Sequence, residues 1–279
     1  MIALVLALAS SLAYGCADFL GGLGARRAHV LCTVMIAAPA SLAVELLLWP
    51  LLGATWSPAA LGWGAASGVA SALAFVLLYR TLAIGPMSVL SPITALVSAV
   101  LPVGLGLAQG ERLGAAALAG IPLALAAVVL VSAGPGADGP ARPSRTALLL
   151  AVGAGTAIAV QLICLHQAPA DSGLAPLITG RAVSSAVTLA AAAAMWRRLG
   201  PERPSLYLSA GSGVLDSLAN LAFLLAVRSG DLAVVAVITA LYPAGTVLLA
   251  RTVLGERIHR SQLAGLALAA LAVSLLALG

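Results

Sequence analysis

The chain has 279 residues, of which 62% are hydrophobic and only 8% are charged. Because a soluble domain carries roughly a quarter of charged residues, this composition excludes a water-covered surface and predicts an integral membrane protein. The net charge of +5 comes from arginines scattered among the loops, which indicates membrane orientation and not a nucleic-acid surface.

Ten apolar stretches are long enough to cross the hydrocarbon core as α-helices, which takes about 20 residues each. In chain order they cover residues 2–24, 28–52, 57–84, 86–109, 113–133, 146–168, 172–196, 204–228, 231–254 and 259–278. The first stretch has no positive residue before it, so we interpret it as a span and not as a signal peptide. Between the fifth and sixth stretches, the Pro- and Gly-rich residues 134–145 are predicted to form a linker.

The second five stretches repeat the first five with a shift of 145 residues. Without any gap, Gly68 matches Gly213, and Gly110-Glu111-Arg112 matches Gly255-Glu256-Arg257. Because five is an odd number of crossings, two successive copies must insert in opposite orientations. The predicted fold class is therefore an all-α integral membrane protein with ten transmembrane helices, arranged as two inverted five-helix repeats over residues 1–133 and 146–279.

Small residues gather at related places in the third and eighth stretches. They occur as Gly64-Ala-Ala-Ser-Gly68 and Gly211-Ser-Gly213. Two interpretations stay open: close helix–helix packing, which needs small residues in a membrane, or a narrow seam that slides during transport.

Each copy also carries an ordered set of motifs around its fourth stretch. The first copy has Ala83-Ile-Gly85, Pro92, Gly110-Glu111-Arg112 and Gly120, and the second has Arg228-Ser-Gly230, Pro243, Gly255-Glu256-Arg257 and Gly265. This ordered set, present twice, resembles the EamA-type transporters of the drug/metabolite transporter (DMT) superfamily. The resemblance implies a secondary carrier, in many relatives an exporter of amino acids, other metabolites or toxic compounds. The prolines of the two copies do not match, so the helix kinks are expected to differ between the halves.

Ionisable residues inside the spans are the best indicators of a transport pathway, because each costs at least ~2.5–3.5 kcal/mol at a helix centre. Asp216 is the deepest, and is either a pathway residue or a buried carboxylate held by its neighbours. Asp18 lies in the pathway or in the interface near Arg26 and Arg27. Arg181 pairs with an acid or is a structural anchor, as the resemblance implies. Glu45, close to Trp49-Pro50, is expected in the interface.

Polar residues accompany these charges at helical spacing. Tyr14 precedes Asp18 by four residues, and Asn220 follows Asp216 by four, so each pair shares a helix face. Pro243 interrupts the ninth stretch, and this break either contacts substrate or is a plain kink. The candidate substrate or coupling residues are Tyr14, Asp18, Gln161, Arg181, Asp216, Asn220, Thr239 and Tyr242.

We therefore expect a secondary transporter of small metabolites or drugs, an exporter that uses alternating access at the repeat interface and proton coupling at Asp216. Burial disfavours the charged form of a carboxyl group, which suits Asp216 to take up and release a proton. We expect Asp216→Asn to reduce proton-coupled transport and to leave folding intact. The alternatives are a membrane-embedded enzyme of lipid metabolism, which clustered acids and histidines would favour, or a channel. The sequence has no catalytic or nucleotide-binding motif, so we expect no enzyme activity, cofactor or metal.

The expected partners are membrane lipid, a small-molecule substrate and protons; nucleic acid is not expected, and the choice between monomer and homodimer stays open. We expect a multi-pass protein of the cell membrane, the inner membrane of a bacterium.

Nearly all loop arginines fall in the odd-numbered loops, which the positive-inside rule places in the cytoplasm with both termini outside. The resemblance implies the opposite orientation. Only 11 residues are aromatic, which argues against an aromatic cage for large cations.

Overall fold

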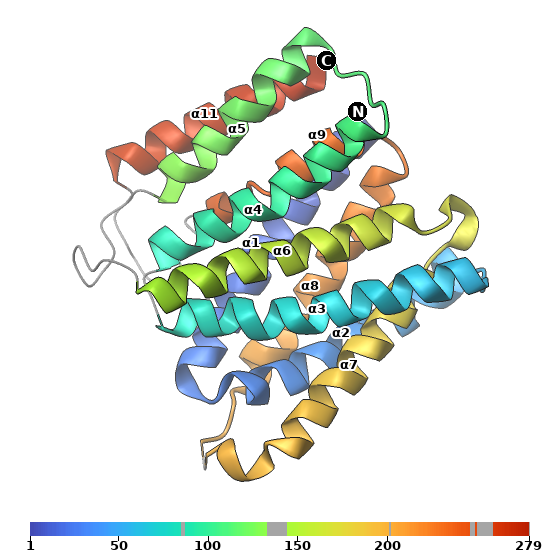
Figure 1. Ribbon diagram of the computed structural model, residues 1–279, viewed down its shortest axis with the longest axis vertical. Coiled ribbons are helices and arrows are strands. Elements are labelled where there is room, and N and C mark those ends of the chain that lie inside the picture. The colour runs from blue at the N-terminus through green and yellow to red at the C-terminus, as the bar shows by residue number, and fades with distance from the viewer. Residues whose placement is uncertain (85–86, 133–143, 201, 246–248, 250–258, 279) are drawn as a thin grey trace.

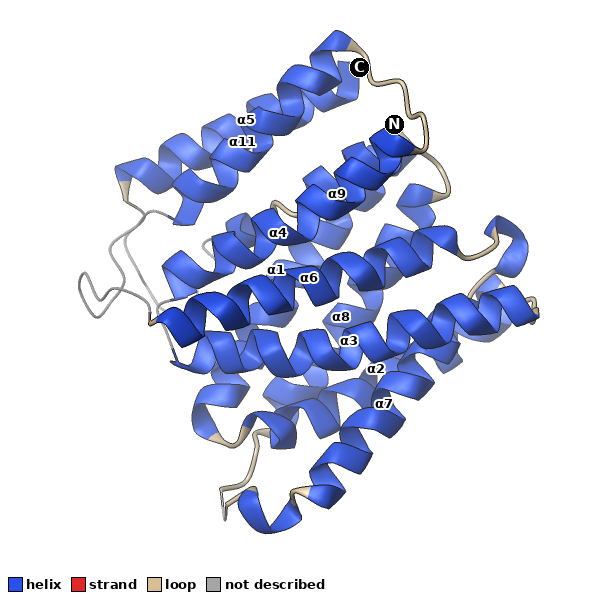
Figure 2. Cartoon of the chain, in the orientation of Figure 1, coloured by secondary structure: helices blue, strands red, loops and turns tan. Residues whose placement is uncertain are grey.

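The computed structural model describes residues 1–84, 87–132, 144–200, 202–245, 249 and 259–278. These residues form a bundle of α-helices without strands (Figures 1 and 2). The first half contains α1 (Ile2–Arg27), α2 (Val30–Leu52), α3 (Pro58–Ile84), α4 (Met87–Ala108) and α5 (Ala115–Ser132). The second half contains α6 (Arg145–Gln167), α7 (Ala175–Ala194), α8 (Leu206–Val227), α9 (Leu232–Thr239) and α11 (Arg260–Leu278), with short 3-10 helices η1 (Ala170–Ser172) and η2 (Trp196–Arg198).

The predicted all-helical membrane fold is confirmed for these residues. Seven helices are long and apolar enough to cross a membrane, and shorter apolar helices cover Ile93–Ala108, Ala115–Val131 and Leu232–Gly245. Helix is the expected form, because in lipid every backbone N–H and C=O must find a partner within the protein. The ninth predicted stretch differs, since α9 already ends at Thr239. Most of the predicted linker and the second Gly-Glu-Arg motif lie outside the described residues.

Large apolar side chains cover the outside of the bundle. Leu73, Val100 and Leu149 are each more than half exposed. A soluble monomer rarely exposes a continuous apolar surface, whereas lipid tails provide a matching solvent. The indole rings of Trp49 and Trp196, near helix ends, are also exposed, as expected at a membrane–water boundary.

Glycines allow helices of opposite halves to pack closely. A Cβ atom built on Gly68 of α3 would lie 2.9 Å from the Gly180 Cα of α7. Gly213 of α8, which matches Gly68 in the repeat, faces Ala37 of α2 in the same way, again with 2.9 Å between the built Cβ and the neighbouring Cα. Close packing is therefore the role that the structure gives to these small residues.

A carboxylate ties the end of α4 to the start of α9. Gly110 has a φ of 90°, a conformation that favours glycine, and turns the chain after α4. The Glu111 carboxylate then accepts hydrogen bonds from the backbone N–H groups of Leu232 (2.7 Å) and Ala233 (3.0 Å). These N–H groups lack partners inside a helix, so the first Gly-Glu-Arg motif caps a helix of the other half.

The close packing can be tested by adding single methyl groups. We expect Gly68→Ala and Gly213→Ala each to lower the free energy of unfolding by about 1–3 kcal/mol, because the methyl group meets backbone atoms. Gly62, on the same helix as Gly68, has nothing within 4 Å of a built Cβ and provides the matched control. Gly62→Ala should stabilise the helix by up to ~1 kcal/mol. Unfolding in mixed micelles measures both effects, and equal stability of Gly68→Ala and Gly62→Ala would contradict the interpretation.

Candidate functional site

A cavity lies between α1, α3 and α4 of the first half and α6, α8 and α9 of the second, and together with its opening it contains about 540 Å³ of empty space. Six of the eight candidate residues line it: Tyr14, Asp18, Gln161, Asp216, Thr239 and Tyr242. The other two, Arg181 and Asn220, line a smaller cavity of about 180 Å³, which shares Ser71 and Gln161 with the larger one. The structure therefore brings all eight predicted residues to one region between the halves.

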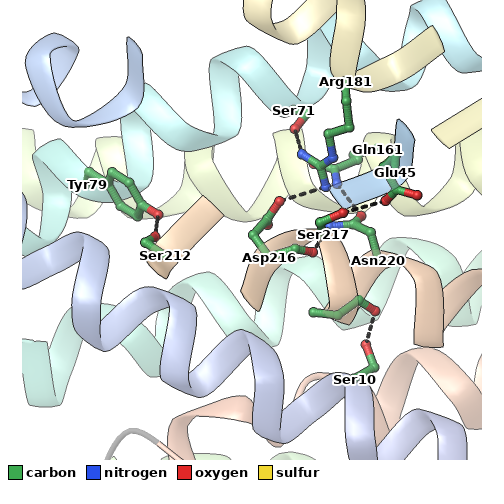
Figure 3. A network of polar contacts seen from close by, with 11 residues as sticks. Ser10, Glu45, Ser71, Tyr79, Gln161, Arg181, Ser212, Asp216, Ser217 and Asn220 are labelled. Atoms are coloured by element: carbon green, nitrogen blue, oxygen red, sulfur yellow. Dashed lines mark hydrogen bonds and ion pairs between the residues drawn. The ribbon is translucent and has the colours of Figure 1, made fainter. Parts of the chain in front are cut away.

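The centre of this region is an ion pair between α7 and α8. Arg181 Nη2 lies 2.7 Å from Asp216 Oδ2, and the Arg181 side chain is only 2% exposed (Figure 3). Arg181 Nη1 also donates a hydrogen bond of 2.9 Å to the Ser71 hydroxyl, and the guanidinium carbon lies 5.9 Å from the centre of the Phe75 ring. Of the two roles considered for Arg181, pairing with an acid is the one observed, and this guanidinium is engaged on three sides.

Two amide side chains extend the network beyond Asp216. Gln161 Nε2 donates a hydrogen bond of 2.6 Å to Asn220 Oδ1, and Asn220 Nδ2 donates one of 2.8 Å to the backbone carbonyl of Asp216. The Asn220 side chain therefore links Gln161 of α6 to the backbone of α8. Both amide nitrogens are already used within the protein (Figure 3).

Asp18 lines the larger cavity. Tyr14, one turn earlier on the same helix face, lines the cavity with it. Arg26 and Arg27, the alternative neighbours of Asp18, are exposed at the end of α1. In the described part of the chain, no Arg or His forms an ion pair with Asp18. Among the described residues, the Asp18 carboxylate therefore differs from that of Asp216 in forming no ion pair.

The break in the ninth predicted span also faces the cavity. Helix α9 ends at Thr239, and Thr239, Ala240 and Tyr242 all line the cavity wall. Pro243 has no N–H group, so it cannot donate to the carbonyl of Thr239 as a helical residue would. Irregular backbone at membrane depth is tolerated where it is buried in protein or lines a cavity, and both conditions hold here.

Sequence reasoning missed several residues of this region. Glu45 was expected in the interface, but its side chain is fully buried and accepts a hydrogen bond of 2.6 Å from the Ser217 hydroxyl of α8. Ser71, which accepts a hydrogen bond from Arg181, was also absent from the predicted site residues. It could have been found from the sequence, because it matches Asp216 in the repeat. Tyr79 and Ser212, buried between α3 and α8, also contact each other through their hydroxyl groups (Figure 3).

Clustered acids and histidines would have favoured the enzyme alternative. Among the described residues, no three His, Cys, Asp or Glu side chains come together in a way that could hold a metal ion. The charged groups of the site are instead distributed over α1, α7 and α8, around a cavity.

Comparison with known proteins identifies the family. Residues 145–278 match the model of the EamA-like transporter family. A solved crystal structure of another protein shares the fold, with a TM-score of 0.75 and 15% identity over 99% of this chain and 96% of that chain. No curated protein is significantly similar in sequence. The apolar helices indicate a multi-pass membrane protein, and the match over its second half, residues 145–278, supports an EamA-type transporter of the DMT superfamily.

Proposed function

We propose that this protein is a secondary carrier that exports small metabolites or drugs across a bacterial inner membrane by alternating access, driven by protons. Membership of a transporter family supports the general class. The observation that carries the proposal is the cavity between the two halves, where a buried ion pair and an unpaired carboxylate lie together. A site at the interface of two repeats can be opened to either side when the halves rock against each other.

The helix contacts support two related halves, residues 1–133 and 146–279, joined by the linker 134–145. The contact of α1 with α8 corresponds to that of α6 with α3. The contact of α2 with α8 corresponds to that of α7 with α3, and the contact of α1 with α9 corresponds to that of α6 with α4. In each of these pairs of contacts, one follows from the other when α1 is exchanged with α6, α2 with α7, α3 with α8 and α4 with α9. Helices α5 and α11, which are equivalent, pack on each other at one side of the bundle (Figure 1). This pattern is expected of two inverted repeats related by a pseudo-twofold axis.

Proton coupling follows from the charge balance of the cavities. Asp18 and Asp216 contribute two carboxylates, and Arg181 contributes one guanidinium. With these three groups ionised, the lining of the two cavities carries one net negative charge, and an uncompensated charge is expensive at membrane depth. A bound proton removes this charge. Release of the proton on the opposite side then couples the transport cycle to the proton gradient.

The first experiment is an export screen. Cells that overexpress the protein should release at least one compound class faster than cells with an empty vector, across a panel of amino acids, nucleosides and antimicrobials. Cells that carry an Asp216→Asn variant at the same membrane abundance should lose most of this difference. Unchanged release of every compound by cells with abundant protein would contradict export.

The coupling role of Asp216 can be tested through the pH dependence of transport. We expect Asp216→Asn to abolish that dependence in proteoliposomes. The ion pair changes the earlier expectation for folding: the variant leaves Arg181 as an uncompensated buried charge, which typically costs about 3–5 kcal/mol.

A double variant separates stability from coupling. Arg181→Gln combined with Asp216→Asn removes both charges and should recover much of the lost stability without restoring coupling. Glu202→Gln, in an exposed loop, is the control and should leave both properties unchanged. A folded double variant with the pH dependence of the natural protein would remove Asp216 from the coupling mechanism.

Membrane orientation gives an independent prediction. The arginine distribution places the loop between α7 and α8 in the cytoplasm and η1 outside. In intact cells, an impermeant maleimide should therefore label Asp171→Cys but not Glu202→Cys, since both positions are exposed. The reverse labelling pattern would place both termini in the cytoplasm.

A further inference from the structure

We infer that the substrate is a small organic cation, whose ammonium group binds the Asp18 carboxylate in the larger cavity. This inference rests on the proposed function, because it names the substrate class of the same transport site. Three observations carry it. Arg181 is already paired with Asp216, the Asp18 carboxylate forms no ion pair with any described residue, and hydroxyl groups and aromatic rings line the same cavity as Asp18.

Charge selects the sign of the ligand. Arg181 lines only the smaller cavity, where Asp216 and Ser71 occupy its two terminal nitrogens at 2.7 and 2.9 Å. Among the described residues that line the larger cavity, the charged ones are Asp18 and Asp216, and only Asp216 has its cation. A ligand that enters the larger cavity therefore meets an excess of negative charge. An anion is repelled there, and a cation supplies the missing counter-ion.

The wall of the cavity also suits an ammonium group. An ammonium donates three hydrogen bonds, and Asp18 offers one charged acceptor. The buried hydroxyl groups of Tyr14 and Thr239 have no hydrogen-bond partner among the described residues, so both are available as further acceptors. Three acceptors thus line one cavity, as an ammonium group requires.

Aromatic rings reinforce this preference. Tyr14, Phe75 and Tyr242 line the cavity and are three of the chain's seven Phe and Tyr residues. The face of an aromatic ring attracts a cation within about 6 Å of its centre. The low aromatic content argued against a cage for large cations, but these rings are concentrated where a small cation would bind. Apolar side chains such as Leu78, Ile158 and Leu162 complete the wall and fit an apolar substrate body.

The same contacts disfavour a ligand that also carries a carboxylate. Such a group needs a free cation or free N–H donors. Arg181 is paired with Asp216, and the amide nitrogens of Gln161 and Asn220 each already donate one hydrogen bond within the protein, at 2.6 and 2.8 Å. A simple amine should therefore bind better than the corresponding amino acid.

Four probes with a common phenyl skeleton test this without any mutation. They are phenethylamine (cation), phenethyl alcohol (neutral), 3-phenylpropanoate (anion) and L-phenylalanine (zwitterion), each titrated at pH 7 by calorimetry into the purified full-length protein in lipid nanodiscs. Phenethylamine should bind at least about tenfold more tightly than each of the others, because only its charge is matched by Asp18. Equal binding of amine and alcohol, tighter binding of phenylalanine, or no binding of the amine at millimolar concentration would each overturn the inference.

Variants then locate the charge preference. In Asp18→Asn, amine and alcohol should bind within about twofold of each other, whereas Glu202→Gln should keep the full preference. A folded Asp18→Asn protein that keeps it would also overturn the assignment. These results are independent of transport: a protein that exports compounds but binds the alcohol as well as the amine refutes only the cation inference. A protein that binds the amine but moves no compound across proteoliposomes refutes only the proposed function.

Discussion

Arg181 and Asp216 lie where an unpaired charge is expensive, and their ion pair allows both to remain there. The acid neutralises the guanidinium at 2.7 Å, while Ser71 and Phe75 contact its other sides. Ser71 and Asp216 occupy matching positions of the repeat, so one guanidinium contacts the same position of both copies. The sequence repeat therefore carries a charge at only one of these two matching positions.

The contacts that hold the halves together also determine where the cavity lies. Glycine contacts bring α3 against α7 and α8 against α2 so closely that a Cβ atom built on Gly68 or Gly213 would meet backbone atoms. The larger cavity lies beside α1, α4, α6 and α9, where α9 ends early. Glu111 fixes the start of α9 from the end of α4. The cavity is therefore bounded by rigid packing on one side and by interrupted backbone on the other.

Much of the fold was predictable because crossing a bilayer constrains length and polarity so strongly. The bounds of nine of the ten predicted stretches agree with those of described helices within a few residues. Hydropathy did not predict the end of α9 at Thr239 within the ninth stretch, because a break in a helix changes the backbone hydrogen bonds but not the apolar character of the sequence. Helical spacing placed Tyr14 with Asp18, but it could not select Arg181 as the partner of Asp216, since that choice depends on tertiary packing. Glu45 was misplaced for the same reason: distance to a helix end does not reveal that α8 covers the side chain.

The charge balance of the cavities links the two proposals into one cycle. One uncompensated carboxylate can be neutralised by a proton or by a cationic substrate, and binding of one removes the attraction for the other. Two ligands that compete for one site exchange across the membrane when the empty, charged site is costly to move through the hydrocarbon region. A proton gradient directed inward would then drive the cation outward. Export, proton coupling and cation selectivity would all follow from two carboxylates, Asp18 and Asp216, sharing the single guanidinium of Arg181 among the described residues that line the cavities.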